Sequence, residues 1–397
     1  MGHSQLSGRE SRRLGERAAA ASGAAAALGL AGLAAGAWLS LRGEGGAQRF
    51  FFSYLVNFLF FLSLSLGALF FVVLQHLTRA GWSVVVRRLA EAVAANVGLM
   101  AALLAPILAM GMQCLYPWAR AEALAAKRPY LTVWFFAARC AAYFAVWIWL
   151  ARQYFKRSVE QDASGDVELT RRMERSSPVA MILFALTTTF ASFDFLMSLD
   201  PHWFSAIFGV YFFSGCALGF LALLALMAAL LQAGGRLQES ITPEHYHDIG
   251  KLIFAFVGFW AYIAFSQYLL IWYADLPEET AWIERRQTGQ WAWASWALLF
   301  GHFFIPFLVL LSRFAKRRKG LLACVAVWVL IFHWIDLAWL AMPELSPQRA
   351  VPDPVDAALF VGVGGLFVAA GAWRLRHCSL IPERDPRLAE SLAFENI

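Results

Sequence analysis

Long apolar runs alternate with short polar segments along the whole chain. Ten of these runs reach about 20 residues, the length with which a helix crosses a hydrocarbon core of ~30 Å. The pattern therefore predicts an all-α integral membrane protein with ten transmembrane helices. The expected helices lie near residues 18–41, 50–77, 90–115, 130–153, 177–199, 203–232, 250–275, 290–312, 320–342 and 354–374. They divide the chain into an N-terminal segment (1–17), a transmembrane domain (18–375) and a C-terminal tail (376–397).

The composition agrees with this pattern. Of the 397 residues, 60% are hydrophobic and only 15% are charged, which is far from the average of a soluble domain. The polar segments between the runs reach at most about 27 residues, too few for a separate catalytic domain. Any chemistry is therefore expected inside the helix bundle or in a partner subunit.

The first run allows two interpretations. The basic segment "SRRLGER" followed by Ala, Gly and Leu residues has the charge order of a cleaved signal peptide. The run is longer than such a peptide needs, and Gly32 and Gly36 have the small-residue spacing that lets two helices pack closely. We therefore expect a retained first helix that packs on another helix of an assembly, with a signal peptide as the alternative.

The cationic residues predict the orientation, because cytoplasmic loops carry an excess of Lys and Arg. The N-terminal segment, the loops after even-numbered helices and the tail together hold 23 of the 33 Lys and Arg residues. Both termini are thus expected in the cytoplasm. The net charge of +6 is explained by this topology, so it gives no reason to expect a nucleic acid partner.

The five cysteines are scattered along the chain, without a CxxC or CxxCH motif. We therefore expect no metal site, no Fe–S cluster and no covalent haem on this chain.

Five ionisable residues interrupt the expected helices between the outer surface and the middle of the membrane. They are Arg139, Asp194, His302, His333 and Asp336. A charged group in hydrocarbon is costly, so each of them is a candidate functional residue. Arg139 should have an acidic partner or a ligand oxygen, with Asp194 and Asp336 as the obvious acids. A structural ion pair that aligns helices is the alternative to a catalytic role.

Two of these residues lie in distinctive local patterns. His302 precedes Pro306 by four residues, so the proline removes the helical hydrogen bond to the carbonyl of His302. That carbonyl either lines a cavity or is satisfied by a neighbouring helix. His333 and Asp336 lie one helical turn apart in "HWIDLAWLAMP" and therefore share one side of their helix.

One face of the expected helix 250–275 carries Lys251, Tyr262, Ser266 and Tyr273. Such a stripe is typical of interhelical packing, and a hydrated proton route is the functional alternative.

Acidic residues gather in two expected outer loops. Asp200 and His202 lie in "SLDPHWFS", and Asp275, Glu278 and Glu279 lie in "WYADLPEETAW". These acids either follow from the charge asymmetry of the topology or release protons and bind a basic partner.

Several long blocks carry a resemblance to a known family. "SFDFLMSLDPHWFSAIFGVYFF", "DIGKLIFAFVGFWAYIAFSQYLLIWYADLPEETAWIERR", "GHFFIPFLVLLSR", "HWIDLAWLAMP" and "DPRLAESLAFEN" resemble the second NrfD/PsrC-type membrane subunit of bacterial alternative complex III, a quinol:cytochrome c oxidoreductase. The similarity runs from about residue 50 to residue 397. It implies NrfD/PsrC-like four-helix bundles in the bacterial inner membrane. Implied partners are a sister NrfD-like subunit, a subunit with Fe–S clusters and a molybdopterin-like fold, c-type haem subunits and lipid.

The resemblance implies that this chain contributes a site for quinone (menaquinone or ubiquinone) or a proton pathway, without showing whether it oxidises quinol itself. Such a site needs an apolar slot, polar groups at the ring oxygens and a base. The residues expected to act on protons are Asp336, His333, Asp194, Arg139 and His302. Those expected to contact the quinone are Arg139, Tyr262, Ser266, Tyr273, Lys251, Asp200 and His202. Two other functions stay open, a b-type cytochrome with His302 and His333 as haem ligands and a secondary transporter.

Overall fold

The computed structural model describes residues 11–15, 17–42, 46–120 and 127–396. Within these ranges, ten helices are long and apolar enough to cross a membrane. This finding confirms the predicted all-α membrane protein and its helix count.

Eight of the spans are each built on one long helix. They are α1 (Arg17–Ser40), α2 (Gly46–Leu77), α6 (Val133–Ser164), α7 (Val167–Phe195), α8 (Phe208–Ala233), α9 (Pro243–Ala274), α14 (Lys319–Ala341) and α15 (Pro354–Leu375). The other two are segmented, as α3 (Val84–Ala94), α4 (Val97–Leu103), the π-helix Ile107–Gly111 and α5 (Met112–Leu115), and as α11 (Trp291–Ala297), the π-helix η5 (Leu298–Phe304) and α12 (Ile305–Leu311). The short helices α10 (Pro277–Gln287), α13 (Arg313–Arg317) and α16 (Leu388–Leu392) lie outside the spans.

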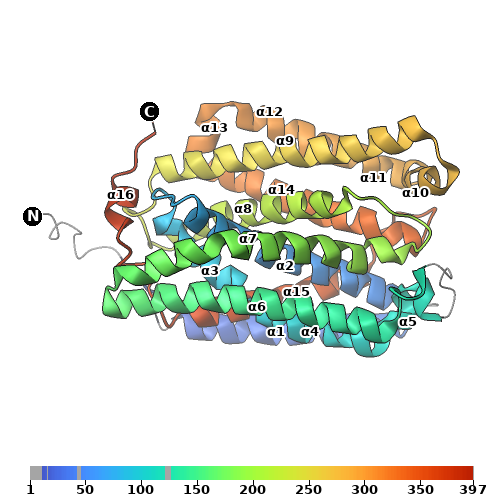
Figure 1. Cartoon of the computed structure of the whole chain (residues 1–397), viewed down its shortest axis with the longest axis horizontal. Coiled ribbons are helices and arrows are strands. Elements are labelled where there is room, and N and C mark those ends of the chain that lie inside the picture. The colour runs from blue at the N-terminus through green and yellow to red at the C-terminus, as the bar shows by residue number, and fades with distance from the viewer. Residues whose placement is uncertain (1–10, 16, 43–45, 121–126, 397) are drawn as a thin grey trace, which may run out of the picture.

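The long helices run along one common direction, with α2 inside the bundle (Figure 1). In the most apolar stretch of α2, 94% of the residues are buried. The helix is apolar on all sides and packs against α3, α7, α8, α14 and α15. Helices α9, α11 and α12 form one side of the bundle, and α1 and α6 lie toward the other. The backbone N–H of Leu380 donates to the carbonyl of Arg12 (2.8 Å), so both ends of the described chain meet at one end of the bundle.

The charged segment between α6 and α7 is helical, which corrects the expected boundaries of the fourth and fifth helices. Helix α6 continues to Ser164 and α7 begins at Val167. Gly165 ends α6 with a φ of +70°, which glycine adopts without strain. The Asp166 carboxylate caps α7 by accepting a hydrogen bond from the backbone N–H of Glu168 (2.9 Å). The mixed charges of this segment therefore belong to helix ends that project beyond the apolar spans.

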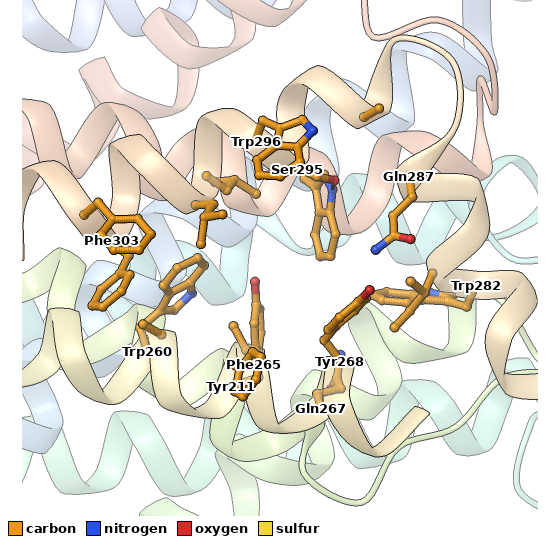
Figure 2. A pocket seen from close by; sticks show the side chains of 18 residues that line it. Tyr211, Trp260, Phe265, Gln267, Tyr268, Trp282, Gln287, Ser295, Trp296 and Phe303 are labelled. Atoms are coloured by element: carbon orange, nitrogen blue, oxygen red, sulfur yellow. Dashed lines mark hydrogen bonds between the residues drawn. The ribbon is translucent and has the colours of Figure 1, made fainter. Parts of the chain in front are cut away.

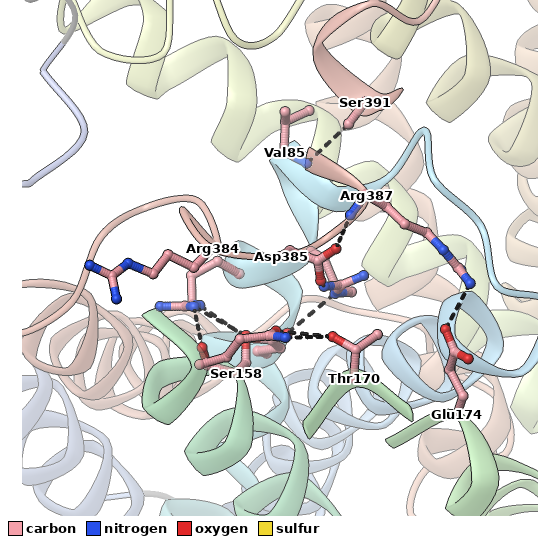
Figure 3. A network of polar contacts seen from close by, with 12 residues as sticks. Val85, Ser158, Thr170, Glu174, Arg384, Asp385, Arg387 and Ser391 are labelled. Carbon is pink, nitrogen blue, oxygen red and sulfur yellow. Dashed lines mark hydrogen bonds and ion pairs between the residues drawn. The ribbon is translucent and has the colours of Figure 1, made fainter. Parts of the chain in front are cut away.

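The C-terminal tail packs against the ends of α3, α6 and α7 (Figure 3). Asp385 forms an ion pair with Arg87 of α3, and Arg387 Nη2 lies 2.8 Å from Glu174 Oε1 of α7. The Ser391 hydroxyl accepts a hydrogen bond from the first turn of α3 (3.3 Å). These contacts make the tail a structural part of the charge-rich end of the bundle.

The glycines of α1 pack against α15. A Cβ added to Gly32 would lie 2.6 Å from the backbone nitrogen of Gly362, and one added to Gly36 would lie 2.7 Å from Leu359 Cδ2. The expected close packing of the first helix is therefore confirmed, and its partner is a helix of the same chain.

Replacing Gly32 by leucine is expected to force α1 away from α15, at a cost of about 1–3 kcal/mol. Gly23→Leu is a matched control, because a Cβ on Gly23 meets no atom within 4 Å. Thermal unfolding of the purified chain should show a lower melting temperature for the first variant only. Equal melting temperatures for the two variants would contradict the tight contact.

Candidate functional site

Asp336 of α14 is buried, with 2% of its surface exposed, and both carboxylate oxygens accept hydrogen bonds. The Tyr211 hydroxyl of α8 donates to Oδ1 (2.5 Å), and the Trp260 indole N–H of α9 donates to Oδ2 (3.2 Å). Among the residues that the structure describes, Asp336 forms no salt bridge with a basic side chain. A buried carboxylate without a cation favours taking up a proton, which is the property of a proton acceptor in a membrane.

His333 lies one turn before Asp336 and contacts α2 and α8. The Ser63 hydroxyl donates to the Phe60 carbonyl (2.7 Å) and lies 2.8 Å from His333 Nε2. The imidazole therefore donates from Nε2 to Ser63, which leaves Nδ1 as an acceptor without a hydrogen-bond partner in the described chain. Gly215 and Gly219 make room for the ring, since an added Cβ at either position would lie about 3 Å from it. His333 and Asp336 share no hydrogen bond.

His302 lies in the π-helix η5 and is fully buried. Its ring packs on Trp260 (4.3 Å between centroids) and lies 6.4 Å from the His333 ring. Neither ring nitrogen of His302 has a hydrogen-bond partner among the described residues. His302 therefore lies next to the Trp260 indole, which donates a hydrogen bond to Asp336.

The π-helix moves the effect of Pro306 by one residue. The N–H of Ile305 bonds to the carbonyl of Phe300, five residues back, so the N–H that Pro306 lacks would have reached the carbonyl of Gly301. The Trp328 indole donates to that carbonyl instead (2.7 Å). The neighbouring helix α14 therefore satisfies the carbonyl of Gly301, and the freed carbonyl of His302 remains a prediction.

A cavity of about 800 Å³ lies beside this cluster, between α8, α9, α10, the segmented helix of α11 and η5, and α14 (Figure 2). Half of the residues in its wall are aromatic, and Gln267, Gln287 and Ser295 add polar groups. Tyr211 and Trp260, the two donors to Asp336, line it as well. Asp336 is therefore one hydrogen bond away from the cavity.

The cavity reaches the surface of the bundle along α9 and α11, because side chains of both helices that line it are exposed. Its lining includes side chains with large exposed surfaces, among them Phe265 (59%) and Trp296 (56%). Both lie within helices that are apolar enough to span a membrane. An apolar molecule dissolved in the lipid could therefore reach the cavity without crossing water.

Helix α10 forms one edge of the cavity and is held by ion pairs. Arg285 pairs with Asp200 and, at 2.5 Å, with Glu344. Arg286 lies 3.5 Å above the ring of Trp282, which lines the cavity, and Glu344 lies 3.4 Å from its guanidinium. Burial lowers the pKa of Arg286 to about 9, while the neighbouring Glu344 acts in the opposite direction. The guanidinium is thus charged at neutral pH and helps to hold the cavity wall.

Arg139 and Asp194 form a second, separate network. Arg139 Nε and Nη2 donate to the two oxygens of Asp194 (2.9 and 2.8 Å), and the Tyr143 hydroxyl donates to the same carboxylate (2.8 Å). Asp194 is fully buried. Of the two acids expected to pair with Arg139, the structure selects Asp194. Asp336 has other partners, so the two networks are not joined by a hydrogen bond.

The remaining expected site residues lie outside the cavity. Asp200 forms an ion pair with Arg285, so the negative charge of the acidic outer loop is partly neutralised within the chain. The side chain of His202 is exposed, and its backbone N–H donates to Asp200 (3.0 Å). The stripe on α9 does not line the cavity, because Lys251, Tyr262 and Tyr273 are exposed on the outside of the bundle. Ser266 is half-buried on the same face. The cavity uses the neighbouring face of α9.

The sequence interpretation missed Tyr211 and Trp260, the direct partners of Asp336. A usable signal was present, because the polar end of an aromatic side chain inside an apolar helix needs a hydrogen-bond partner. Tyr211 lies four residues into the apolar helix α8, and Trp260 lies near the middle of α9.

No protein-family model and no curated protein matches this chain.

Proposed function

We propose that this chain is the NrfD/PsrC-type membrane subunit of a respiratory quinol oxidoreductase, and that its aromatic cavity binds the quinone ring. The observation that carries the proposal is that both donors to the buried Asp336 carboxylate line an apolar cavity open to the membrane. Such a cavity accepts a lipid-soluble ring, and the carboxylate beside it accepts a proton.

The cavity fits a quinone by size and by chemistry. Its volume of about 800 Å³ lies within the range of small-molecule sites, and its walls offer aromatic faces on which a flat ring can stack. Tyr211 and Gln267 lie in the wall at different points, so they can form hydrogen bonds with two ring oxygens. An isoprenoid tail would leave through the opening beside Phe265 and Trp296.

Quinol supplies two electrons and two protons, and the chain's own residues handle one proton. A ligand hydroxyl donates to the oxygen of Tyr211 while the Tyr211 hydroxyl proton moves to Asp336 Oδ1, along the hydrogen bond already present. The tyrosine is neutral before and after this shift, and Asp336 becomes a neutral acid. Trp260 orients the carboxylate through Oδ2. In the assembled complex, an Fe–S or c-type haem centre on a partner subunit would accept the electrons, and the second quinol proton would leave to water at the outer face.

The charge distribution supports an orientation with both termini in the cytoplasm of a bacterial cell, because most cationic residues gather at that end. In that orientation α10 and the cavity lie toward the outer face, since α10 lies at the end of the bundle opposite the tail (Figure 1). A proton taken by Asp336 would then be released outward.

The His302 and His333 rings, 6.4 Å apart, are a weaker basis for the second candidate function, a b-type cytochrome. Neither histidine lines the large cavity, and both rings pack against aromatic side chains, Trp260 and Phe60. A visible absorption spectrum of the purified chain with the bands of bis-histidine haem would favour the cytochrome over the quinone site.

Filling the cavity tests the proposal. Ala264 of α9 lines the cavity, so Ala264→Trp should weaken binding of a short-tailed quinone to the purified chain by at least about tenfold, or 1.4 kcal/mol. Ala255→Trp is the matched control, because Ala255 is exposed on the same helix and does not line the cavity. Equilibrium dialysis measures both. Equal quinone affinity of the two variants would show that the quinone does not bind in this cavity, and binds either elsewhere on the chain or not at all.

A further inference from the structure

A shallow depression of about 510 Å³ lies on α6, and none of its lining residues lines the cavity described above. Arg152, Lys156 and Arg157 line it together with Gln153, Glu160 and apolar groups that include Trp149 and Ile148. The cations lie at the end of the depression closer to the C-terminus of α6, and the apolar side chains lie at the other end. The depression thus combines a cationic part with an apolar part.

The position along α6 places the cations at a membrane boundary. Arg152 follows Val133, the first residue of α6, by a helix length of about 28 Å at 1.5 Å per residue. The hydrocarbon core is ~30 Å thick, so the guanidinium lies at the level of the lipid headgroups. Trp134 and Trp149 are 73% and 54% exposed near the two boundaries, where tryptophan is enriched in membrane proteins.

Two of the cations have no acidic partner in the part of the chain that the structure describes. Among the described residues, Arg152 and Arg157 form no ion pair and no hydrogen bond, and Nη1 of Arg157 is shielded from solvent without a partner. Other arginines at this end of the bundle differ, because Arg87 pairs with Asp385 and Arg387 pairs with Glu174. An unpaired, partly shielded guanidinium favours an external anion.

We propose that this depression binds an anionic phospholipid of the phosphatidylglycerol class. Arg152 and Arg157 bind the phosphate, and Lys156, which lies 3.5 Å from Glu160, adds positive charge at the rim. The acyl chains lie along Ile148 and Trp149 toward the middle of the membrane. A free phosphate ion would leave the apolar half of the depression unused, which is why we assign a lipid. This inference is independent of the proposed quinone site.

The test uses the purified full chain in detergent and native mass spectrometry to count bound phosphatidylglycerol against phosphatidylcholine. Cations near a membrane surface contribute roughly a fivefold effect each, so Arg152→Gln with Arg157→Gln should lower the preference for phosphatidylglycerol by about 25-fold. Arg171→Gln with Arg175→Gln is the control of equal charge change. Both of its arginines are exposed and pair with Glu168 outside the depression, so the preference should stay as in the unmodified chain.

An unchanged preference in the Arg152 and Arg157 variant, or an equal loss in the control, would overturn the proposal. So would displacement of the lipid by millimolar inorganic phosphate, which would identify a phosphate site. Should the double variant fail to fold, Trp149→Phe provides a second measurement in vesicles. Exposed Trp149 meets both lipids, so the difference in quenching between the unmodified chain and Trp149→Phe should be larger with brominated phosphatidylglycerol than with brominated phosphatidylcholine. Equal quenching differences for the two lipids would also contradict the assignment.

Discussion

If the chain belongs to the proposed quinol oxidoreductase, replacing Asp336 by asparagine is expected to lower quinol oxidation by that complex by at least about 10²-fold, the loss typical of removing a positioned acid or base. The amide keeps the size of the side chain and one acceptor for Tyr211 or Trp260, but it does not take up a proton at neutral pH. Because Asp336 has no cationic partner among the described residues, the substitution leaves no buried cation unpaired. The complex should therefore assemble with its haems intact. The oxidation rate and the absorption spectrum of the purified complex measure both results.

A tyrosine pair provides the control for this prediction. Tyr211→Phe removes the hydroxyl between the cavity and Asp336, so it should also lower the oxidation rate strongly. Tyr54→Phe removes a buried hydrogen bond as well, to the carbonyl of Leu103 (2.7 Å), but Tyr54 does not line the cavity and the rate should stay near normal. A stable Asp336→Asn complex with full activity would exclude the carboxylate from the proposed reaction.

Asp194→Ala is expected to give the largest loss of stability, about 3–5 kcal/mol, because it leaves the Arg139 guanidinium mostly buried without its carboxylate. The variant also removes the acceptor of the Tyr143 hydroxyl. The yield and the melting temperature of the purified chain should both fall. Quinone binding per folded molecule should stay unchanged, since Asp194 and Arg139 do not line the cavity.

The double variant Arg139→Met with Asp194→Leu separates charge from packing. It removes both charges and fills a similar volume, so it should recover much of the stability that Asp194→Ala loses. A double variant as unstable as the single one would show that Tyr143 and the local packing depend on the carboxylate itself. Normal stability of Asp194→Ala combined with lost quinol oxidation would instead assign Asp194 to proton transfer.

The expected residues of the buried cluster show how far sequence reasoning reaches. The one-turn spacing of His333 and Asp336 placed both on one side of a helix, and both are buried in α14. Their hydrogen-bond partners come from three other helices, Ser63 of α2 at His333, and Tyr211 of α8 and Trp260 of α9 at Asp336. Gly215 and Gly219 leave space for the imidazole, whereas Tyr211 reaches the carboxylate. The spacing of His333 and Asp336 along α14 does not predict either of these contacts.

The ten apolar spans were predictable from the sequence alone, because the length and hydropathy of a run are local properties, and a helix in lipid must satisfy its own backbone hydrogen bonds. The boundaries beyond the apolar runs, such as the helical turns up to Ser164, depend on capping and on contacts with the tail. The pairing of Arg139 with Asp194, the placement of Tyr211 and Trp260 at Asp336, and the cavity itself were decided only by the tertiary structure. Inside a membrane bundle all helices offer similar apolar surfaces, so polar partners are determined by how helices distant in the sequence pack, and a sequence pattern on one helix does not contain that information.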